Sequence, residues 1–211
     1  MRIVKEAKER ENEILDAASI LFSEKGFDGT SIADILLKVG IARGTLYYHF
    51  KSKEDMMNAL IERTTTQMLC AAKNAAELKL PVIDRIVNVV LSLNTQENCG
   101  DEMLAHMHSP QNALMHQKTQ KAILTHLTPV LADLIREGIN QGVFHTEFPY
   151  ECMEMVMTYA LVAFDDDDTI ALTEESKVLR IGAFIYNVER LLGAEKGSFA
   201  PAMMRMFSGG N

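Results

Sequence analysis

The sequence is poor in cysteine and has no CxxC pair. Its three cysteines, Cys70, Cys99 and Cys152, are odd in number and far apart along the chain. A disulfide framework needs paired cysteines and a structural zinc site needs closely spaced ligands, so neither is indicated. We therefore expect the reducing cytoplasm as the compartment of this protein.

Long apolar runs are also missing. No stretch approaches the roughly 18 consecutive apolar residues of a membrane-spanning helix, and the first residues, MRIVKEAKEREN, are unlike a signal peptide. The sequence also lacks a phosphate-binding loop, a nucleophile motif and a recognisable pair of catalytic carboxylates. We expect no membrane attachment, no enzymatic activity and no cofactor.

The charge of the chain is unevenly distributed. Its 211 residues are 47% hydrophobic, enough to form a core in one or two compact domains, and the formal net charge is −8. Residues 1–53 contain nine Lys/Arg and eight Asp/Glu, or +1, which leaves twelve and twenty-one, or −9, for the remainder. Because the acidity belongs to the second part, the first part is free to contact DNA.

The N-terminal region has the pattern of a helix-turn-helix. Apolar residues at helical spacing predict a first helix that ends at Gly26. Ser31 and Asp34 form a capping box that opens a short second helix, which Gly40 ends. The segment 42–50 predicts another short helix, aromatic and polar where a core helix is aliphatic. Two short helices joined by a tight glycine-containing turn make a helix-turn-helix.

The rest of the chain predicts helices only. A second capping box, Ser52 with Asp55, opens a long helix that runs toward Leu80 and is stopped by Pro81. Further helices are expected at about 82–97, 102–108, 111–140, 149–165 and 173–192, with Pro129 kinking or splitting the third of these. The expected fold is all-α, with a three-helix DNA-binding domain at 1–53 and a helical effector-binding and dimerisation domain at 54–211.

Residues 30–56, TSIADILLKVGIARGTLYYHFKSKEDM, resemble the signature of the TetR/AcrR family of bacterial transcriptional regulators. The residues that match the family's closing pattern are Gly44, Thr45, Leu46, Tyr47, Phe50, Lys53 and Glu54. A weaker resemblance covers residues 136–151, which look like the Gly-x-Phe turn before the dimerisation helices. The resemblance implies a dimer that binds double-stranded operator DNA, more often as a repressor than as an activator, and that places its second short helix in the major groove.

The chemistry of the reading helix can be argued from its residue types. Arg43 suits guanine, whose major-groove edge accepts two hydrogen bonds from a guanidinium, and Gly44 lets the backbone approach DNA. Leu46 and Phe50 are expected to pack inward, and Ala42 stands where the family usually has a serine cap. The residues expected to contact DNA are Thr30, Ser31, Arg43, Gly44, Thr45, Tyr47, Tyr48, His49 and Lys53, with the hydroxyls and Lys53 directed at phosphates.

Methionines cluster in the segments that line the ligand cavity of TetR-like proteins. Their flexible side chains suit an apolar or amphipathic organic effector, although each methionine taken singly is also explained as ordinary core. The residues expected to bind the effector are Met103, His106, Met107, Asn112, Met115, His116, Met153, Met157 and Tyr159.

Other interpretations of these features stay open. A metal sensor built from Cys99, His106, His108 and His116 uses suitable ligands, but His106 and His108 face different directions on a helix, so no metal is expected. The acidic run at 165–168 suits a solvated loop better than a cation site. A head that contacts protein instead of DNA would bind DNA weakly and without steep salt dependence.

The last two strong helices are the candidates for dimerisation. One face of the first carries Met153, Val156, Met157, Ala160, Leu161 and Phe164. One face of the second carries Val178, Ile181, Ile185, Val188 and Leu192, and Gly182 and Ala183 permit close approach there. Two such helices packed against a symmetry mate give a four-helix interface. We expect a homodimer that binds a pseudo-palindromic operator and is released by a small organic effector.

Overall fold

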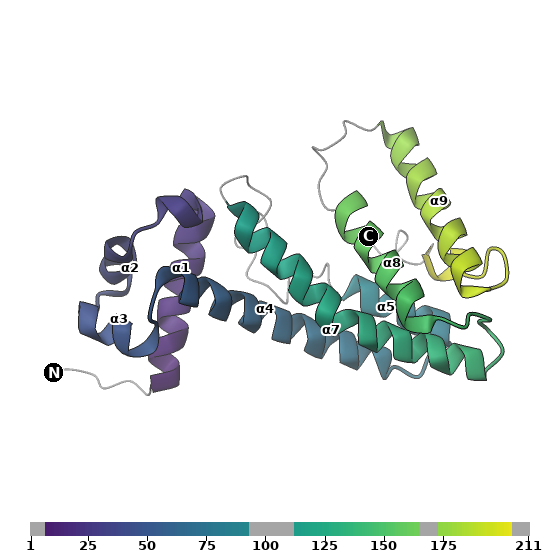
Figure 1. Ribbon diagram of the computed structural model, residues 1–211, viewed down its shortest axis with the longest axis horizontal. Coiled ribbons are helices and arrows are strands. Elements are labelled where there is room, and N and C mark those ends of the chain that lie inside the picture. The colour runs from purple at the N-terminus through teal and green to yellow at the C-terminus, as the bar shows by residue number, and fades with distance from the viewer. Residues whose placement is uncertain (1–6, 93–111, 165–172, 204–211) are drawn as a thin grey trace. The chain divides into compact units, whose positions relative to one another are not determined.

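The computed structural model describes residues 7–92, 112–164 and 173–203, and within them it contains helices and no strand (Figure 1). The expected all-α fold is confirmed. The expected helix at 102–108 lies outside the described residues. The helices are α1 (Ala7–Gly29), α2 (Ile32–Val39), α3 (Arg43–His49), α4 (Lys53–Ala76), α5 (Val82–Leu91), α7 (Ala113–Asn140), α8 (Pro149–Ala163) and α9 (Glu174–Leu192).

The chain forms two compact units, which we call the head and the body. The head takes its residues from 1–67 and 96–122, and the body from 68–95 and 123–211. This division differs from the sequence-based boundary after residue 53. The first turns of α4 and α7 carry side chains that are buried in the core of the head, so a boundary drawn between helices misses them.

The head core is built from one face of each helix. Ile14, Leu21 and Phe22 of α1 are buried at the helical spacing the sequence predicts, and they meet Ile35 of α2 and Leu46 of α3. Later members of this core come from α4 and α7: Met56, Met57, Leu60, Ile61 and Met115. The short helices α2 and α3 are thus held by longer ones, as helices of this length need to be.

The ends of α2 follow the local signals in the sequence. Ser31 caps the helix with Oγ accepting from the Asp34 amide at 3.2 Å, and the Asp34 carboxylate accepts from the Ser31 amide at 2.9 Å, which confirms the expected capping box. Gly40 ends the helix at φ 72°, a left-handed conformation that glycine adopts without a Cβ penalty. The start and end of this helix are therefore fixed by adjacent residues alone.

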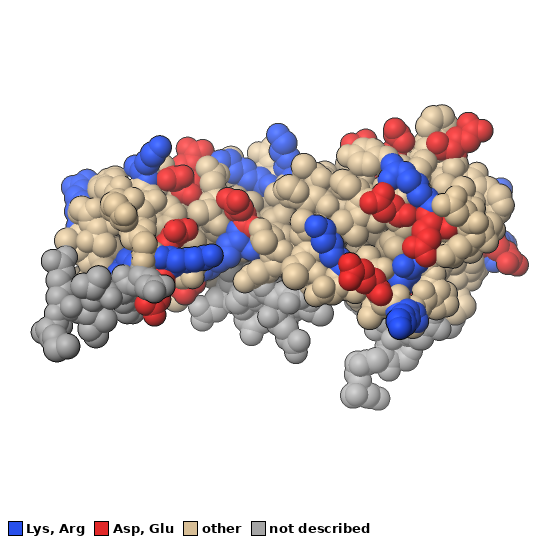
Figure 2. All heavy atoms as spheres, turned by 90° about the horizontal axis from the view of Figure 1, so that it is seen from below, with Lys and Arg blue, Asp and Glu red and all other residues tan. Residues whose placement is uncertain are grey.

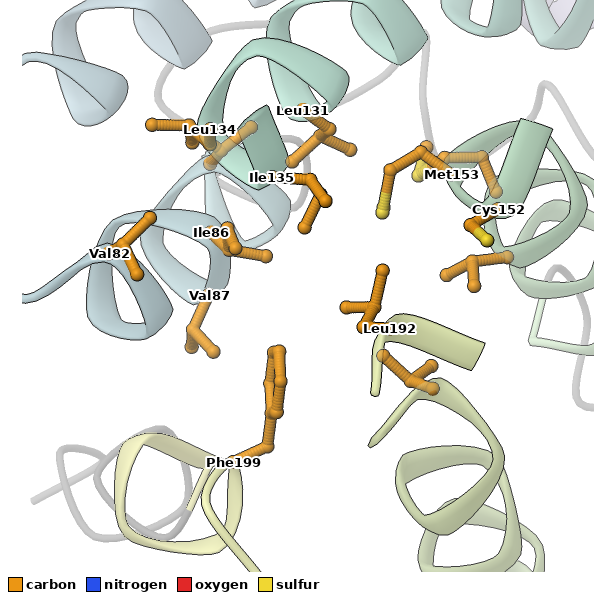
Figure 3. Packing of buried hydrophobic residues seen from close by; sticks show 14 of the residues in the cluster. Val82, Ile86, Val87, Leu131, Leu134, Ile135, Cys152, Met153, Leu192 and Phe199 are labelled. Atoms are coloured by element: carbon orange, nitrogen blue, oxygen red, sulfur yellow. The ribbon is translucent and has the colours of Figure 1, made fainter. Parts of the chain in front are cut away.

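The body packs α5, α7, α8 and α9 around an aliphatic core. Figure 3 shows Ile86 of α5, Leu131 and Ile135 of α7, Met153 of α8 and Leu192 of α9 converging on it. Part of the face of α8 and α9 that was expected to form the dimer interface packs into this core, because Met153, Val156, Met157, Val188 and Leu192 are buried within the same chain, whereas Phe164 and Val178 of that face are exposed.

Helix α7 continues through Pro129 to Asn140, so the expected split near Thr128 is not observed. The helix then ends in a tight turn. Gly142 has φ 74°, and the ring of Phe144 lies against Gly138, where an added Cβ would come within 2.2 Å of a ring carbon. In the Gly-x-Phe pattern, the glycine thus forms the turn and the phenylalanine packs against α7, and together they direct the chain toward α8.

A buried carboxylate of α9 binds the backbone of the segment that follows this helix. Glu189 of α9 is buried and accepts hydrogen bonds from the amides of Gly197 at 2.8 Å and Phe199 at 3.1 Å. The Phe199 ring stacks on Phe144 at a centroid distance of 6.2 Å. These contacts fix the segment after α9 to the core. None of the helices in the described ranges is both long and apolar enough to cross a lipid bilayer.

Candidate nucleic-acid interface

Helix α3 has one buried face and one exposed polar-aromatic face. Leu46 is fully buried and Phe50 nearly so, as expected, and together they anchor the helix in the head core. Arg43, Tyr47 and Tyr48 are exposed, with Tyr48 at 80% exposure, and Thr45 and His49 are half-buried. A short helix that is anchored by apolar residues and displays a guanidinium and two phenols has the composition of a major-groove reading helix.

The exposed side chains of α3 support one another. The Arg43 guanidinium lies over the Tyr47 ring at 5.6 Å, and the Tyr48 ring meets His49 edge-on at 5.1 Å. Arg43 and Tyr47 are four residues apart, so they occupy the same side of the helix. Contact with a ring limits the conformations of the arginine, which favours paired hydrogen bonding to a base edge.

The start of α3 is slim and uncapped. Ala42 occupies the cap position with no side-chain hydrogen bond, as its side chain requires. Gly44 follows, and a Cβ added there would meet nothing within 4 Å. The space beside Gly44 is open, so the first turn of α3 can come close to a large partner.

Thr30 has a different role from the one expected. Its side chain is only 2% exposed, and its hydroxyl donates to the carbonyls of Leu21 at 3.0 Å and Gly26 at 2.8 Å. A hydroxyl used in this way does not reach a phosphate. The neighbouring Ser31 is exposed, but its hydroxyl donates to the Asp34 carboxylate at 2.5 Å while it caps α2.

Lys53 also turns inward. Its ammonium donates to the carbonyls of Phe27 at 2.5 Å and Thr30 at 2.9 Å, and it lies 4.3 Å from the centroid of the Phe27 ring. The sequence predicted a phosphate contact here because lysine at the start of a helix suits an anion. In the folded chain the carbonyls of the α1–α2 turn, residues 26–30, take up these donors instead.

The charges around α2 are arranged in pairs. Lys25 donates to the Asp34 carboxylate at 2.8 Å, and this hydrogen bond, with those from Ser31, holds the pKa of Asp34 well below its usual range. On the face drawn in Figure 2, basic and acidic side chains are interspersed and form no broad region of one sign.

The residues expected to bind an effector are divided between the two units. Met115 is buried in the head core, His116 is half-buried on the same helix, and Asn112 is buried with its amide bonded to α1. Met153 and Met157 belong to the body core, and Tyr159 is half-exposed on α8. Met103, His106 and Met107 lie outside the described residues, as do Cys99 and His108 of the metal alternative.

The described part of the body has a groove between α7 and α8 with a volume of about 710 Å³. Tyr159 lines it, and so do hydroxyl groups that sequence analysis did not single out. One of these, the buried hydroxyl of Thr128, has no hydrogen-bond partner among the described residues. The lining residues are Leu124, Thr125, Thr128, Tyr150, Glu154, Met155, Thr158, Tyr159 and Val162. No group of His, Cys, Asp and Glu residues suited to a metal ion occurs within the described ranges.

Comparison with known families agrees with this architecture. A family model described as "Bacterial regulatory proteins, tetR family" matches residues 14–60, and a model of a "Tetracyclin repressor-like, C-terminal domain" matches residues 95–186. The HTH-type transcriptional regulator UidR of Escherichia coli is 32% identical over 194 residues, which cover 89% of this chain and 93% of UidR.

Solved structures share the fold. Salmonella enterica GusR superposes with a TM-score of 0.61 at 22% identity, over 90% of this chain and 99% of that one. A gamma-butyrolactone receptor described as an ArpA-like protein gives a TM-score of 0.61 at 16% identity, over 96% and 98% of the two chains. At these identities the likeness concerns the arrangement of helices.

The inward position of Lys53 leads to a prediction about stability. Lys53→Met keeps the aliphatic stem and removes the ammonium, which leaves the two carbonyls without this donor and should lower the free energy of unfolding by about 1.5–3 kcal/mol. Lys51→Met is the matched control, because Lys51 is exposed. Urea denaturation followed by circular dichroism measures the free energy of unfolding of both variants. Equal stability of the two would contradict a stabilising role of the Lys53 hydrogen bonds.

Proposed function

The chain belongs to the TetR family of bacterial regulatory proteins and is a helix-turn-helix transcriptional regulator, and we propose that it is a homodimeric repressor of pseudo-palindromic operators that a small organic effector releases. The observation that carries the proposal is the exposed face of α3, where Arg43, Tyr47 and Tyr48 stand on a helix anchored by Leu46. DNA as the target implies action in the bacterial cytoplasm.

Specific reading is assigned to Arg43. It is the first residue of α3, it is exposed, and its guanidinium is held against Tyr47. Phosphates and thymine methyl groups are assigned to Thr45, Tyr47, Tyr48 and His49. The DNA backbone beside α2 is assigned to Ser31. Contacts to phosphates position the helix, whereas contacts to base edges carry the sequence preference.

Selection of bound fragments from random duplex DNA tests this assignment. The wild-type protein should enrich two inverted half-sites, with centres about 34–36 Å apart or a multiple of it. Arg43→Ala should relax the preference at one base pair in each half-site by about 1–3 kcal/mol. Lys51→Ala serves as the control, since losing an exposed positive charge should weaken all sequences alike. Unchanged preference in the Arg43 variant would remove the residue from the reading surface.

A second copy of this chain is the partner proposed for the outer face of α8 and α9. The two helices lie side by side, and Arg180 of α9 donates to the Ala163 carbonyl at the end of α8 at 3.2 Å (Figure 1). They also carry apolar side chains that face solvent and lie outside the lining of the α7–α8 groove: Phe164 at the end of α8 and Val178, Leu179, Tyr186 and Leu191 on α9. Gly182 and Ala183 lie between Leu179 and Tyr186 and leave room for close helix approach.

Dimerisation through this face supports the operator model, because a two-fold dimer presents one reading helix to each half of a palindrome. Apolar helix faces that would otherwise meet water gain by being covered. The exposed apolar side chains of α8 and α9 are thus the ones proposed for the interface, in place of those that are buried within the chain.

Leu179→Glu tests the dimer face. Leu179 is 75% exposed, so the change should leave the fold intact, but it places a charge in the interface and should raise the dimer dissociation constant about 30-fold or more, a loss of ~2 kcal/mol. Leu37→Glu is the matched control, because Leu37 is an 85% exposed leucine of α2 in the head. Sedimentation equilibrium across micromolar concentrations compares them. A Leu179 variant that remains as dimeric as the Leu37 variant contradicts the assignment.

The groove between α7 and α8 is the site proposed for the effector. Its volume suits a drug-sized organic molecule. Leu124, Met155 and Val162 provide apolar contact, and the unpaired hydroxyl of Thr128 provides a buried group that a ligand can satisfy. Among the described residues that line it, Glu154 is the one charged residue, so the groove favours neutral or cationic molecules over anionic ones.

Two probes with the same ring system and opposite charge test this site. The 1-naphthylmethylammonium ion should bind more tightly than 1-naphthoate by fluorescence titration and should release operator DNA, while Glu154→Gln should remove the difference. Glu151→Gln is the control, since Glu151 is an exposed carboxylate of α8 outside the groove lining. Preference for the anion, or operator binding that persists at saturating cation, would contradict the proposal.

A further inference from the structure

Asn112, the residue directly before α7, joins the start of that helix to the end of α1 inside the head. The residue is 3% exposed. Its Oδ1 accepts from the Phe27 amide at 2.9 Å, and its Nδ2 donates to the Phe22 carbonyl at 3.1 Å. A single buried amide thus serves both an N–H and a C=O group of α1, and these two groups are 85 and 90 residues away from it in sequence.

The backbone groups that Asn112 binds lie on either side of a break in α1. Gly26 has φ 76° and ψ 163°, so the helical path is interrupted between Phe22 and Phe27. Backbone groups at such a break lack the regular partners of a helix and need donors and acceptors from elsewhere. The asparagine side chain has one donor group and one acceptor, which match this pair.

The turn that Asn112 closes also sets the position of α2. Thr30 ends the turn, Ser31 follows as the cap of α2, and Lys53 of α4 binds the carbonyls of Phe27 and Thr30. The side chains that hold this turn therefore come from three places in the sequence. Of these, only Asn112 lies outside the family model of the DNA-binding region, which covers residues 14–60, and it directly precedes α7.

Other contacts fix the same end of α7 to the head. Met115 is buried in the head core, and Lys118 donates to the Glu54 carboxylate at 3.1 Å and the Asn58 amide oxygen at 2.8 Å on α4. Further along, the same helix contributes Thr125 and Thr128 to the effector groove. One continuous helix thus carries residues of the head at its start and residues of the groove beyond them.

We propose that Asn112 is a positioning residue for DNA binding. Its two hydrogen bonds hold the α1–α2 turn against the start of α7, so that displacement of α7 by an effector disturbs α2 and the reading helix. The coupling to an effector rests on the proposed function, whereas the positioning of the turn does not. Loss of the two Asn112 hydrogen bonds should weaken operator binding about tenfold, within the range of couplings between sites in regulated proteins.

The test compares Asn112→Ala and Asn112→Asp with Thr119→Val in the full-length protein. Asp retains an oxygen that can accept from Phe27 but offers no donor to Phe22. Thr119 is the matched control, because it is equally buried near the start of α7 and its hydroxyl donates to the Met115 carbonyl of its own helix at 3.0 Å. All three variants lose a buried polar contact of the head, but the control leaves the α1–α2 turn untouched.

Hydrogen exchange of the Phe27 amide, measured without DNA or probe, reports directly on its hydrogen bond to Asn112. It should accelerate at least tenfold in Asn112→Ala and remain near the wild-type rate in Asn112→Asp and Thr119→Val. Operator affinity should fall in both Asn112 variants and stay within twofold of wild type in Thr119→Val at comparable melting temperatures. Equal losses of affinity in the control, or unchanged Phe27 exchange in Asn112→Ala, overturn the proposal.

Release by the naphthylmethylammonium probe separates the two proposals. If wild type binds operator and releases it with the probe, Asn112→Ala should bind the probe as before but show a smaller change in operator affinity. An unaltered change in that variant overturns the coupling. A wild-type protein that ignores the probe counts against the effector groove, and the exchange and affinity measurements still decide the positioning role.

Discussion

The backbone at the end of α1 has to be given hydrogen-bond partners, and the position of the reading helix depends on how this is done. The break at Gly26 occurs where the chain must leave one helix and enter the next within a few residues. Thr30 supplies a hydroxyl, Lys53 an ammonium and Asn112 an amide to the groups that result. Because unsatisfied buried backbone groups are costly, these side chains act together as one structural requirement for the head.

Local sequence signals predicted the helices of the head well. The capping box of Ser31 and Asp34 and the glycine at position 40 act over three or four residues, so they specify the ends of α2 without reference to the rest of the chain. The inward face of α3 was equally predictable, since Leu46 and Phe50 stand at helical spacing in an otherwise polar segment. The family signature adds the function of this surface, which spacing alone does not indicate.

The roles of Thr30, Lys53 and Asn112 were not predictable in the same way. Each residue type has a good explanation as a DNA or ligand contact, and only the folded chain shows that carbonyls of α1 lie within reach. The body presents a related difficulty. Helix α8 has apolar residues on two sides, and periodicity cannot tell the buried Met153 and Met157 from the exposed Met155 and Val162. In both cases the missing information is which distant segment lies opposite.

The partners of Asn112 and Glu189 also bear on the order in which a growing chain can fold. The helix-turn-helix is synthesised early, yet the break in α1 stays without its amide partner until residue 112 has been made. Likewise, the backbone amides that donate to the buried carboxylate of Glu189 belong to residues 197 and 199, which are synthesised after it. Domains generally fold as units during synthesis, N-terminal ones first. Here each unit draws a required contact from a later stretch of chain, so the DNA-reading surface matures only after the first segment of the body, residues 68–95, has been translated.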